Sequence, residues 1–335
     1  MAVKIIAEAG VNHNGEIQNA YRLIDSAKFA GADAIKFQSF SSIELTAENA
    51  PKAKYQQMYA DRSTQREMLA RLELNEMEHQ LIADYCEKIE IEFLSTAFGQ
   101  SQLDLLIKLK VQAIKVASGE ITHWPLLKEM AKKAYENNLD VYLSTGMSEI
   151  KEIQDALDIF IKEDISLGKI FILHCTSHYP APYNAVNMKA LRTLRNTFQC
   201  KVGYSDHTTG ILTSVVAVAL GAEIIEKHIT LDQAMKGPDH KASLNPQEFR
   251  SMVKEIRNCE EILGQEEKTL QDCERDTRYV ARRSIRASEI INKGDVLNEK
   301  NLICKRPNDG ISPMNYPQIL GKRAKREYEI GECID

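Results

Sequence analysis

The sequence alternates between short strand-like runs and longer amphipathic runs typical of helices, and this alternation limits the fold more than any other feature. The strand-like runs, rich in Ile, Val, Phe and Ala, cover residues 3–7, 32–40, 91–95, 113–117, 141–144, 169–174, 203–207 and 224–228. A helical pattern follows each of them, from the first after residue 16 to the last at 246–263. Eight such units in succession predict an α/β fold, a closed parallel (β/α)8 or TIM barrel.

The pattern changes after residue 264. Residues 265–281 are rich in charge and almost free of apolar periodicity, which predicts a partly helical linker. Residues 282–335 contain short runs separated by Gly and Pro, which predicts a small compact domain. A unit of this size is only marginally stable alone. We therefore expect a barrel at 1–264, a linker at 265–281 and a small domain at 282–335, stabilised by the barrel or by a second subunit.

Composition and charge exclude several classes of protein. No apolar run reaches the length of a membrane span, and no signal-peptide pattern precedes residues 3–7, so we expect a cytoplasmic protein that does not enter a membrane. The seven cysteines are scattered without a CxxC pair, which favours reduced thiols. The net charge of -5 argues against nucleic-acid binding. The basic cluster at 322–326 is interpreted as a solvated face.

Two successive predicted strands end on a histidine. They are GYSDH at 203–207 and IIEKH at 224–228, joined by an apolar stretch at 210–220 that predicts the connecting helix. Neighbouring parallel strands lie about 4.8 Å apart, so His207 and His228 can converge on one divalent cation at the barrel mouth. Histidines that only complete hydrogen-bonded turns remain the alternative.

Two lysines lie near the ends of largely apolar strands. Burying an unpaired ammonium group is costly, so Lys36 and Lys115 each require an anion. A phosphorylated substrate would supply it, and internal pairing with Glu8 or Glu120 remains the alternative. Hydroxyl side chains stand at neighbouring strand ends: Thr96, Ser118 and Ser205. We therefore expect the mouth of the barrel to bind an anion.

Ten stretches, in this order, resemble the bacterial sialic acid (N-acetylneuraminate) synthase family. They are AEAGVNHNG at 7–15, IKFQSF at 35–40, FLSTAF at 93–98, IKVASGE at 114–120, STGM at 144–147, HCTSHYPAP at 174–182, GYSDHTTG at 203–210, EKHIT at 226–230, KGPDHKAS at 236–243 and KRPNDGISP at 305–313. The last resembles the signature of the C-terminal antifreeze-like SAF domain, a β-clip fold. The resemblance covers essentially the whole chain.

The resemblance implies an activity. Members of the family condense phosphoenolpyruvate with open-chain N-acetylmannosamine, with C–O cleavage and release of phosphate. The alternative is synthesis of N,N'-diacetyllegionaminate from 2,4-diacetamido-2,4,6-trideoxymannose by the same chemistry. Synthesis of pseudaminate is a further alternative. A non-catalytic protein that binds a ligand or ice is disfavoured, since residues 293–305 are charged and not repetitive.

The resemblance also implies roles for individual residues. Those that would line phosphoenolpyruvate are Lys36, Thr96, Lys115, Ser118, Ser177 and Ser205. Ser177 stands where relatives often have Asn or Thr, a change that could loosen a contact to phosphate. Those that would contact the sugar are Gln38, Glu120, Tyr179, Asp239 and, across a domain-swapped homodimer, Arg306 of the partner subunit. His207 and His228 would hold the metal, Mn²⁺ in preference to Mg²⁺ or Co²⁺. Glu8 and Glu120 are the candidates for proton handling.

Overall fold

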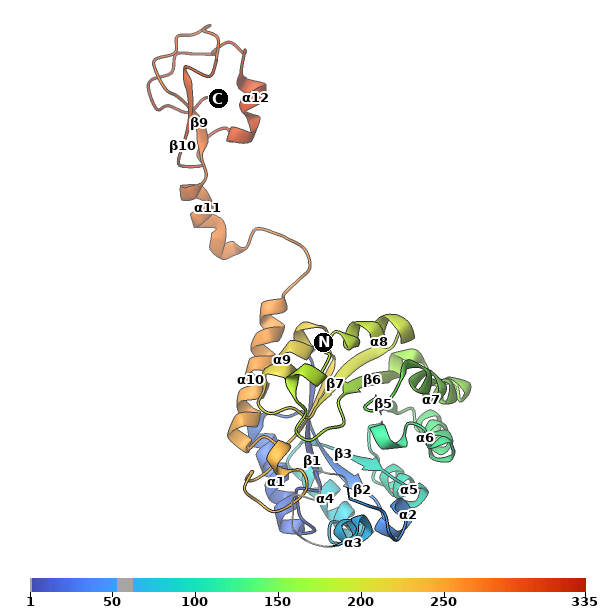
Figure 1. The fold of residues 1–335 in the computed structure, drawn as a ribbon. Coiled ribbons are helices and arrows are strands. Elements are labelled where there is room, and N and C mark those ends of the chain that lie inside the picture. Colours follow the sequence, from blue (N-terminus) through green and yellow to red (C-terminus); the bar gives the residue numbers. More distant parts are fainter. Residues whose placement is uncertain (1, 53–62) are drawn as a thin grey trace. The chain divides into compact units, whose positions relative to one another are not determined.

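The chain consists of two compact units, Met1–Gly264 and Gln265–Asp335. The computed structural model describes residues 2–52 and 63–335 (Figure 1). Each unit is described by itself.

The first unit is a closed barrel of eight parallel strands. In order around the barrel they are β1 (Lys4–Gly10), β2 (Ala34–Ser39), β3 (Glu92–Ala97), β4 (Ala113–Val116), β5 (Asp140–Ser144), β6 (Ile170–Cys175), β7 (Lys201–Asp206) and β8 (Ile224–His228). β8 pairs with β1 in parallel register and closes the ring. The predicted TIM barrel is confirmed.

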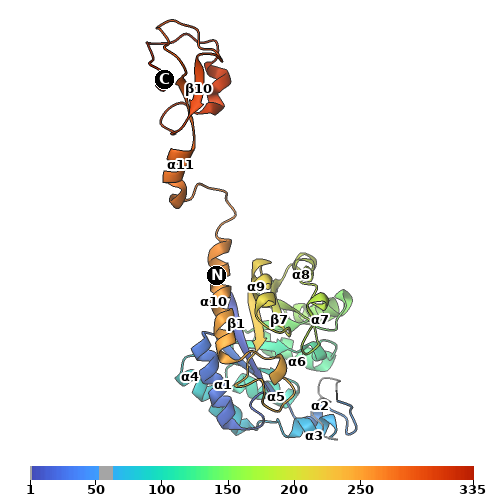
Figure 2. The ribbon, with the colours of Figure 1, turned by 60° about the vertical axis from the view of Figure 1, so that its left-hand side comes forward.

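Helices surround the strands (Figures 1 and 2). The main ones are α1 (Ile17–Ala30), α4 (Glu76–Lys88), α5 (Gln100–Lys108), α6 (Trp124–Glu136), α7 (Ile150–Lys162), α8 (Ala190–Phe198), α9 (Leu212–Ala219) and α10 (Pro246–Leu263). The connection between β2 and α4 adds α2 (Ser42–Leu45) and α3 (Gln65–Ala70). Short 3₁₀ turns stand in four other connections: η2 (Ser118–Glu120), η3 (Leu167–Lys169), η4 (Tyr183–Ala185) and η5 (His240–Ala242).

Local sequence explains where these helices begin and end. α10 begins after Asn245, whose side chain accepts hydrogen bonds from two backbone N–H groups while Glu248 bonds back to the Asn245 N–H. α1 ends at Gly31, which has a φ of 84° and so adopts the left-handed conformation that glycine tolerates. Leu23, Ile24 and Ala27 of α1 are buried on the side facing the strands.

Apolar side chains, here called the apolar plug, fill the part of the barrel interior nearer the N-terminal ends of the strands. It is formed by Ile6, Ala34, Leu94, Ala113, Tyr142, Phe171, Leu173 and Ile224, all buried. Side chains two residues further along a strand point to the same side, so the next inward positions lie closer to the C-terminal mouth. On β1, β2, β4 and β8 these positions are occupied by Glu8, Lys36, Lys115 and Glu226. The plug therefore supports a layer of charged side chains.

The second unit has its own small core. It contains η6 (Asp272–Glu274), α11 (Arg275–Ala281), η7 (Pro313–Asn315), α12 (Tyr316–Ile319) and an antiparallel pair of strands, β9 (Ser284–Ala287) and β10 (Leu302–Lys305). Its buried apolar residues include Ile285, Leu302, Tyr328 and Ile334. Residues 265–281, the predicted linker, contain η6 and α11. None of the helices in the described part of the chain is long and apolar enough to cross a membrane.

Gly203 of β7 tests the packing of the plug. A Cβ atom at this position would lie 2.4 Å from Leu173 Cδ2 and 2.8 Å from the carbonyl oxygen of Ile224. We expect Gly203→Ala to lower the free energy of barrel unfolding by about 1–3 kcal/mol in urea titrations. Gly168→Ala is the control, because a Cβ there would meet only Ser166 Oγ at 3.9 Å. Equal stability of the two variants would contradict this packing.

Candidate active site

Four charged side chains form a buried group at the C-terminal mouth, here called the charge cluster: Glu8, Lys36, Lys115 and Glu226. Lys36 Nζ lies 2.6 Å from Glu8 Oε2 and 3.7 Å from Glu226 Oε2. Lys115 Nζ lies 3.4 Å from Glu226 Oε1. The relative exposure of the four residues does not exceed 5%. Two ammonium groups and two carboxylates thus neutralise one another in a site that water barely reaches.

Each lysine thus has an internal carboxylate partner, the alternative that the sequence left open. The partner of Lys115 is Glu226 and not Glu120, which lies in η2 and pairs with His123 Nδ1 at 2.9 Å. The contact of both lysines with phosphoenolpyruvate stays a prediction. Glu226 is not among the site residues predicted from the sequence. A signal for it existed, since Glu226 stands two residues before His228 and therefore shares its face of the strand.

Burial and neighbouring charges separate the two carboxylates chemically. Burial raises the pKa of Glu8 to about 7, against the opposing influence of the Lys36 ammonium group. Burial also disfavours the charged form of Glu226, but Lys115 and Lys36 outweigh it and hold the pKa of Glu226 below its usual value. Glu226 is therefore a permanent anion. Glu8 exchanges a proton near neutral pH, which suits its predicted role in proton handling.

Hydroxyl groups add hydrogen bonds to the cluster. Lys36 Nζ donates to Thr96 Oγ1 at 3.0 Å, and Lys115 Nζ donates to Ser144 Oγ at 2.7 Å. Ser205 Oγ donates to Glu226 Oε1 at 2.8 Å. The structure thus brings together four of the residues predicted to line phosphoenolpyruvate: Lys36, Thr96, Lys115 and Ser205.

The other two predicted residues of this set, Ser118 and Ser177, meet at Gly146. Ser118 Oγ accepts a hydrogen bond from the Gly146 N–H at 3.0 Å and lies 3.2 Å from Cys175 Sγ. A Cβ atom on Gly146 would lie 2.2 Å from Ser177 Oγ and 2.9 Å from Ser118 Oγ. A glycine is required there because the backbone after β5 passes directly against these hydroxyls.

The two candidate metal ligands lie side by side. The ring centroids of His207 and His228 are 5.8 Å apart, and both residues are buried. His207 Nδ1 lies 2.8 Å from the carbonyl oxygen of Thr176. A carbonyl only accepts, so Nδ1 carries the proton and Nε2 of the neutral ring has a free lone pair. Burial lowers the pKa of both imidazoles and favours this neutral form.

These features fit a divalent cation. Nδ1 of His228 is buried without a hydrogen-bond partner among the described residues. Two neutral imidazoles at this spacing suit a first-row metal. No group of three or more His, Cys, Asp or Glu side chains within residues 2–52 and 63–335 could hold an ion. Water or substrate would supply the remaining ligands.

A cavity of about 90 Å³ adjoins His228. Its polar side is formed by Gln38, Tyr179 and Asp239, three of the residues predicted to contact the sugar. Tyr179 also stacks on His207, with ring centroids 4.2 Å apart. Burial raises the pKa of Asp239 to about 6. Val11, Met68, Leu69 and Pro238 also line the cavity. Two predicted sugar contacts lie elsewhere, Glu120 at η2 and Arg306 after β10 in the second unit.

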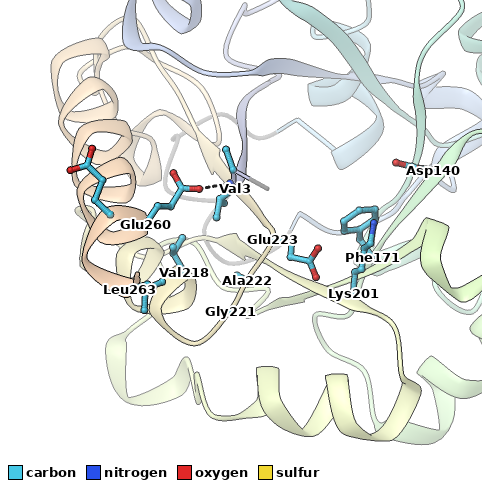
Figure 3. Close-up of a pocket in the computed structure, with 12 residues that line it drawn as sticks. Val3, Asp140, Phe171, Lys201, Val218, Gly221, Ala222, Glu223, Glu260 and Leu263 are labelled. Atoms are coloured by element: carbon cyan, nitrogen blue, oxygen red, sulfur yellow. Dashed lines mark hydrogen bonds between the residues drawn. The ribbon is translucent and has the colours of Figure 1, made fainter. Parts of the chain in front are cut away.

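Two cavities of more than about 700 Å³ also border the barrel. One, of about 820 Å³, lies between the connections after β5 and β6 and is lined in part by Thr145, Cys175 and Ser177. The other, of about 720 Å³, lies at the N-terminal ends of the strands (Figure 3), where Glu260 accepts a hydrogen bond from the Val3 N–H at 2.5 Å. None of the predicted site residues lines the second cavity. Active sites of TIM barrels lie at the opposite face.

The barrel and the residues at its C-terminal mouth define a TIM-barrel enzyme. Its site contains a buried carboxylate that exchanges a proton, two lysines that pair with carboxylates, and two adjacent imidazoles. The NeuB family model matches residues 23–268, and the SAF domain model matches residues 282–335. The chain belongs to the NeuB family and ends in a SAF domain. The resemblance to the sialic acid synthases is thereby confirmed.

Individual relatives match over almost their whole length. The chain is 45% identical over 331 residues to the N,N'-diacetyllegionaminic acid synthase of Campylobacter jejuni, covering 98% of each. It is 44% identical over 338 residues to the enzyme of the same name from Legionella pneumophila, covering 100% of this chain and 94% of the relative. The crystal structure of an N-acetylneuraminic acid (sialic acid) synthetase from Leptospira borgpetersenii in complex with citrate matches with a TM-score of 0.71 and 34% identity, covering 83% of this chain and 90% of the other.

The charge cluster predicts a stability difference between two glutamates. Glu226→Ala leaves two buried ammonium groups without their shared carboxylate, so we expect the barrel to lose about 3–5 kcal/mol of unfolding free energy. Glu120→Ala removes the same atoms from a pair whose histidine is 46% exposed, and we expect a loss below about 1 kcal/mol. Urea unfolding of both variants measures the difference. Similar losses would show that Glu226 does not neutralise the lysines.

Proposed function

We propose that the chain is an N,N'-diacetyllegionaminate synthase. It condenses phosphoenolpyruvate with open-chain 2,4-diacetamido-2,4,6-trideoxymannose and releases phosphate. The family resemblance alone favours N-acetylmannosamine, with this sugar as the alternative. The similarity to two relatives named for diacetyllegionaminic acid, over nearly their whole length, supports the second sugar. The relative named for N-acetylneuraminic acid is less similar in sequence.

Four apolar residues, Val11, Met68, Leu69 and Pro238, contribute to the lining of the cavity beside His228, which is otherwise polar. Leu69 packs against the small cluster of Val11, Phe40 and Leu72, which holds α3 against the end of β1. Met68, the preceding residue of α3, lines the cavity with Val11 and Leu69. The proposed sugar differs from N-acetylmannosamine by a C6 methyl group and a second acetamido group. A methyl group gains free energy where it contacts these apolar side chains. The similarity to the two relatives, and not the cavity, carries the choice of sugar.

The size of the cavity is consistent with one substituent of the sugar. A volume of about 90 Å³ is several times the ~10–15 Å³ that one water molecule needs. Gln38, Tyr179 and Asp239 on the polar side would hold the hydroxyl and amide groups of the rest of the substrate.

Bond formation joins C3 of phosphoenolpyruvate to the aldehyde carbon of the sugar. The aldehyde oxygen gains a proton, and C2 of the enol phosphate becomes cationic and adds water, which loses a proton. The resulting hemiketal phosphate breaks its C–O bond and releases inorganic phosphate. When bound by His207 and His228, a divalent cation such as Mn²⁺ supplies Lewis-acid stabilisation of negative charge on oxygen. Of the candidates for proton handling, Glu8 is the one we assign to proton exchange, because burial raises its pKa to about 7.

The charge cluster determines how the anionic substrate is bound. Lys36 and Lys115 already have carboxylate partners, so an incoming phosphate or carboxylate group must share these ammonium groups with Glu8 and Glu226. Protonation of Glu8 removes one competing charge at little cost near neutral pH. Thr96, Ser118 and Ser144 offer hydroxyl donors to the same anion, with Ser177 beside Ser118, while the Ser205 hydroxyl donates to Glu226.

Two chains would form the domain-swapped homodimer that the resemblance implies. Arg306 is exposed in the second unit and, as Arg306 of the partner subunit, would contact the sugar.

The sugar preference tests the proposal. Phosphate release is measured with phosphoenolpyruvate, Mn²⁺ and each of three sugars: the diacetamido-trideoxymannose, N-acetylmannosamine and the pseudaminate precursor. We expect kcat/KM for the first to exceed the others by at least about 10-fold, the lower end of the discrimination that one added methyl or methylene group provides. Equal or faster turnover of N-acetylmannosamine would restore the first interpretation. Failure with all three would reject the function.

Substrate binding is also expected to take up a proton. At pH 8 the Glu8 carboxyl, with a pKa of about 7, is mostly ionised in the free protein. An anion bound beside it raises this pKa further, so phosphoenolpyruvate binding draws in close to one proton. Calorimetric titrations in buffers with different ionisation enthalpies measure this uptake. Glu8→Gln abolishes it if the account holds, and an unchanged uptake in that variant would assign the proton to another group.

A further inference from the structure

A second buried ion pair lies behind the two histidines. Lys227 Nζ is 2.9 Å from Asp206 Oδ2, and both side chains are 0% exposed. Asp206 immediately precedes His207, and Lys227 immediately precedes His228. Because side chains alternate along a strand, both point away from the barrel interior. They lie where β7 and β8 meet α9, which packs against β7 (Figure 2).

The carboxylate of Asp206 accepts an unusually complete set of hydrogen bonds. Its donors are the Thr208 N–H at 2.8 Å, Thr208 Oγ1 at 2.8 Å, Thr213 Oγ1 at 2.8 Å, Ser214 Oγ at 2.7 Å and Tyr204 OH at 3.3 Å. Thr213 and Ser214 belong to the first turn of α9. The pair therefore fixes the turn between β7 and α9 to both elements.

Lys227 links this turn to the neighbouring strand. Besides its ion pair, its ammonium group donates to the carbonyl oxygen of Thr208 at 2.6 Å. Lys227, which precedes His228, thus contacts Asp206 and Thr208, the two residues on either side of His207. A hydrogen bond from His207 Nδ1 to the carbonyl oxygen of Thr176 fixes the ring itself.

Stability alone does not account for such a pair. Desolvating two charges costs several kcal/mol, and apolar replacements of buried pairs are often neutral or stabilising. Metal sites, by contrast, require ligand positions accurate to about 0.5 Å, and supporting groups supply that accuracy. The contacts of Asp206 and Lys227 act on the backbone that sets the distance between the two imidazoles.

We propose that Asp206 and Lys227 are positioning residues that hold His207 and His228 at the separation needed to bind one divalent cation. The inference rests on the metal site of the proposed function. Its consequence is that metal affinity depends on two side chains that do not touch the cation.

The test measures the Mn²⁺ dissociation constant without substrates, from the free-ion EPR signal. Lys227→Met removes the link between the two strands while Asp206 retains its neutral donors. We expect binding about 10-fold weaker than in the wild type, the lower end for supporting groups of metal ligands. The double variant Asp206→Leu/Lys227→Met removes both charges and is expected to show the same loss of affinity. Its thermal unfolding midpoint is expected to fall, because the donors to Asp206 lose their acceptor, so binding is measured below that midpoint.

Lys4→Met is the matched control. Lys4 Nζ pairs with Glu92 Oε2 at 2.7 Å near the opposite end of the strands, so its loss should leave Mn²⁺ binding unchanged. Ser214→Ala, which removes one donor to Asp206, is expected to weaken binding in the same direction by a smaller factor. It keeps the inference testable if the stronger variants do not fold.

Wild-type affinity in a folded Lys227→Met or double variant would overturn the positioning role. So would wild-type affinity in Ser214→Ala if that is the variant that folds. Equal Mn²⁺ binding by wild type and His207→Ala would be a different result, because it would remove the metal site of the proposed function and the inference together.

Discussion

The burial of two ammonium groups and two carboxylates at one end of the barrel is the constraint on which the rest of the site depends. Lys36 and Lys115 lie in a buried layer directly next to the apolar plug. Each of them therefore requires an opposite charge. Glu226 serves both lysines and stays ionised, and Glu8 is left with a pKa near 7. One fixed charge and one exchangeable proton result from the same four side chains.

In strand β8 the side chains alternate between two faces, and each face has its own functions. Ile224 belongs to the apolar plug, Glu226 to the charge cluster and His228 to the candidate metal site, all on the inward face. Lys227 faces the other way and pairs with Asp206 beneath α9. Five consecutive residues of β8 therefore contribute to the apolar core, the charge cluster, the candidate metal site and the ion pair behind that site. A shift of register by one residue would exchange all of these faces.

The sequence predicted the barrel because the apolar runs and helical patterns are local signals, and it predicted His207 and His228 because both end strands that are consecutive in the chain. It did not predict the partner of Lys115. Glu226 lies 111 positions away in sequence, and only the register of the closed barrel places it in the same layer. The residues that line the cavity proposed to hold part of the sugar could not all be predicted from the sequence either. Met68 and Leu69 belong to α3, a helix outside the regular strand–helix alternation, so no periodic pattern indicated that they line the cavity.

The most direct test of the central claim is an infrared titration of the buried carboxyl groups, comparing wild type with Glu8→Gln. The account predicts a protonated carboxyl band in the wild type that disappears with a midpoint near pH 7 and is absent from the variant. The band of Asp239, whose pKa is raised to about 6, is expected in both proteins. Carboxyl spectra that are the same in both proteins between about pH 5 and pH 9 would mean that Glu8 is ionised throughout. That result would contradict the charge cluster as a site with one fixed charge and one exchangeable proton.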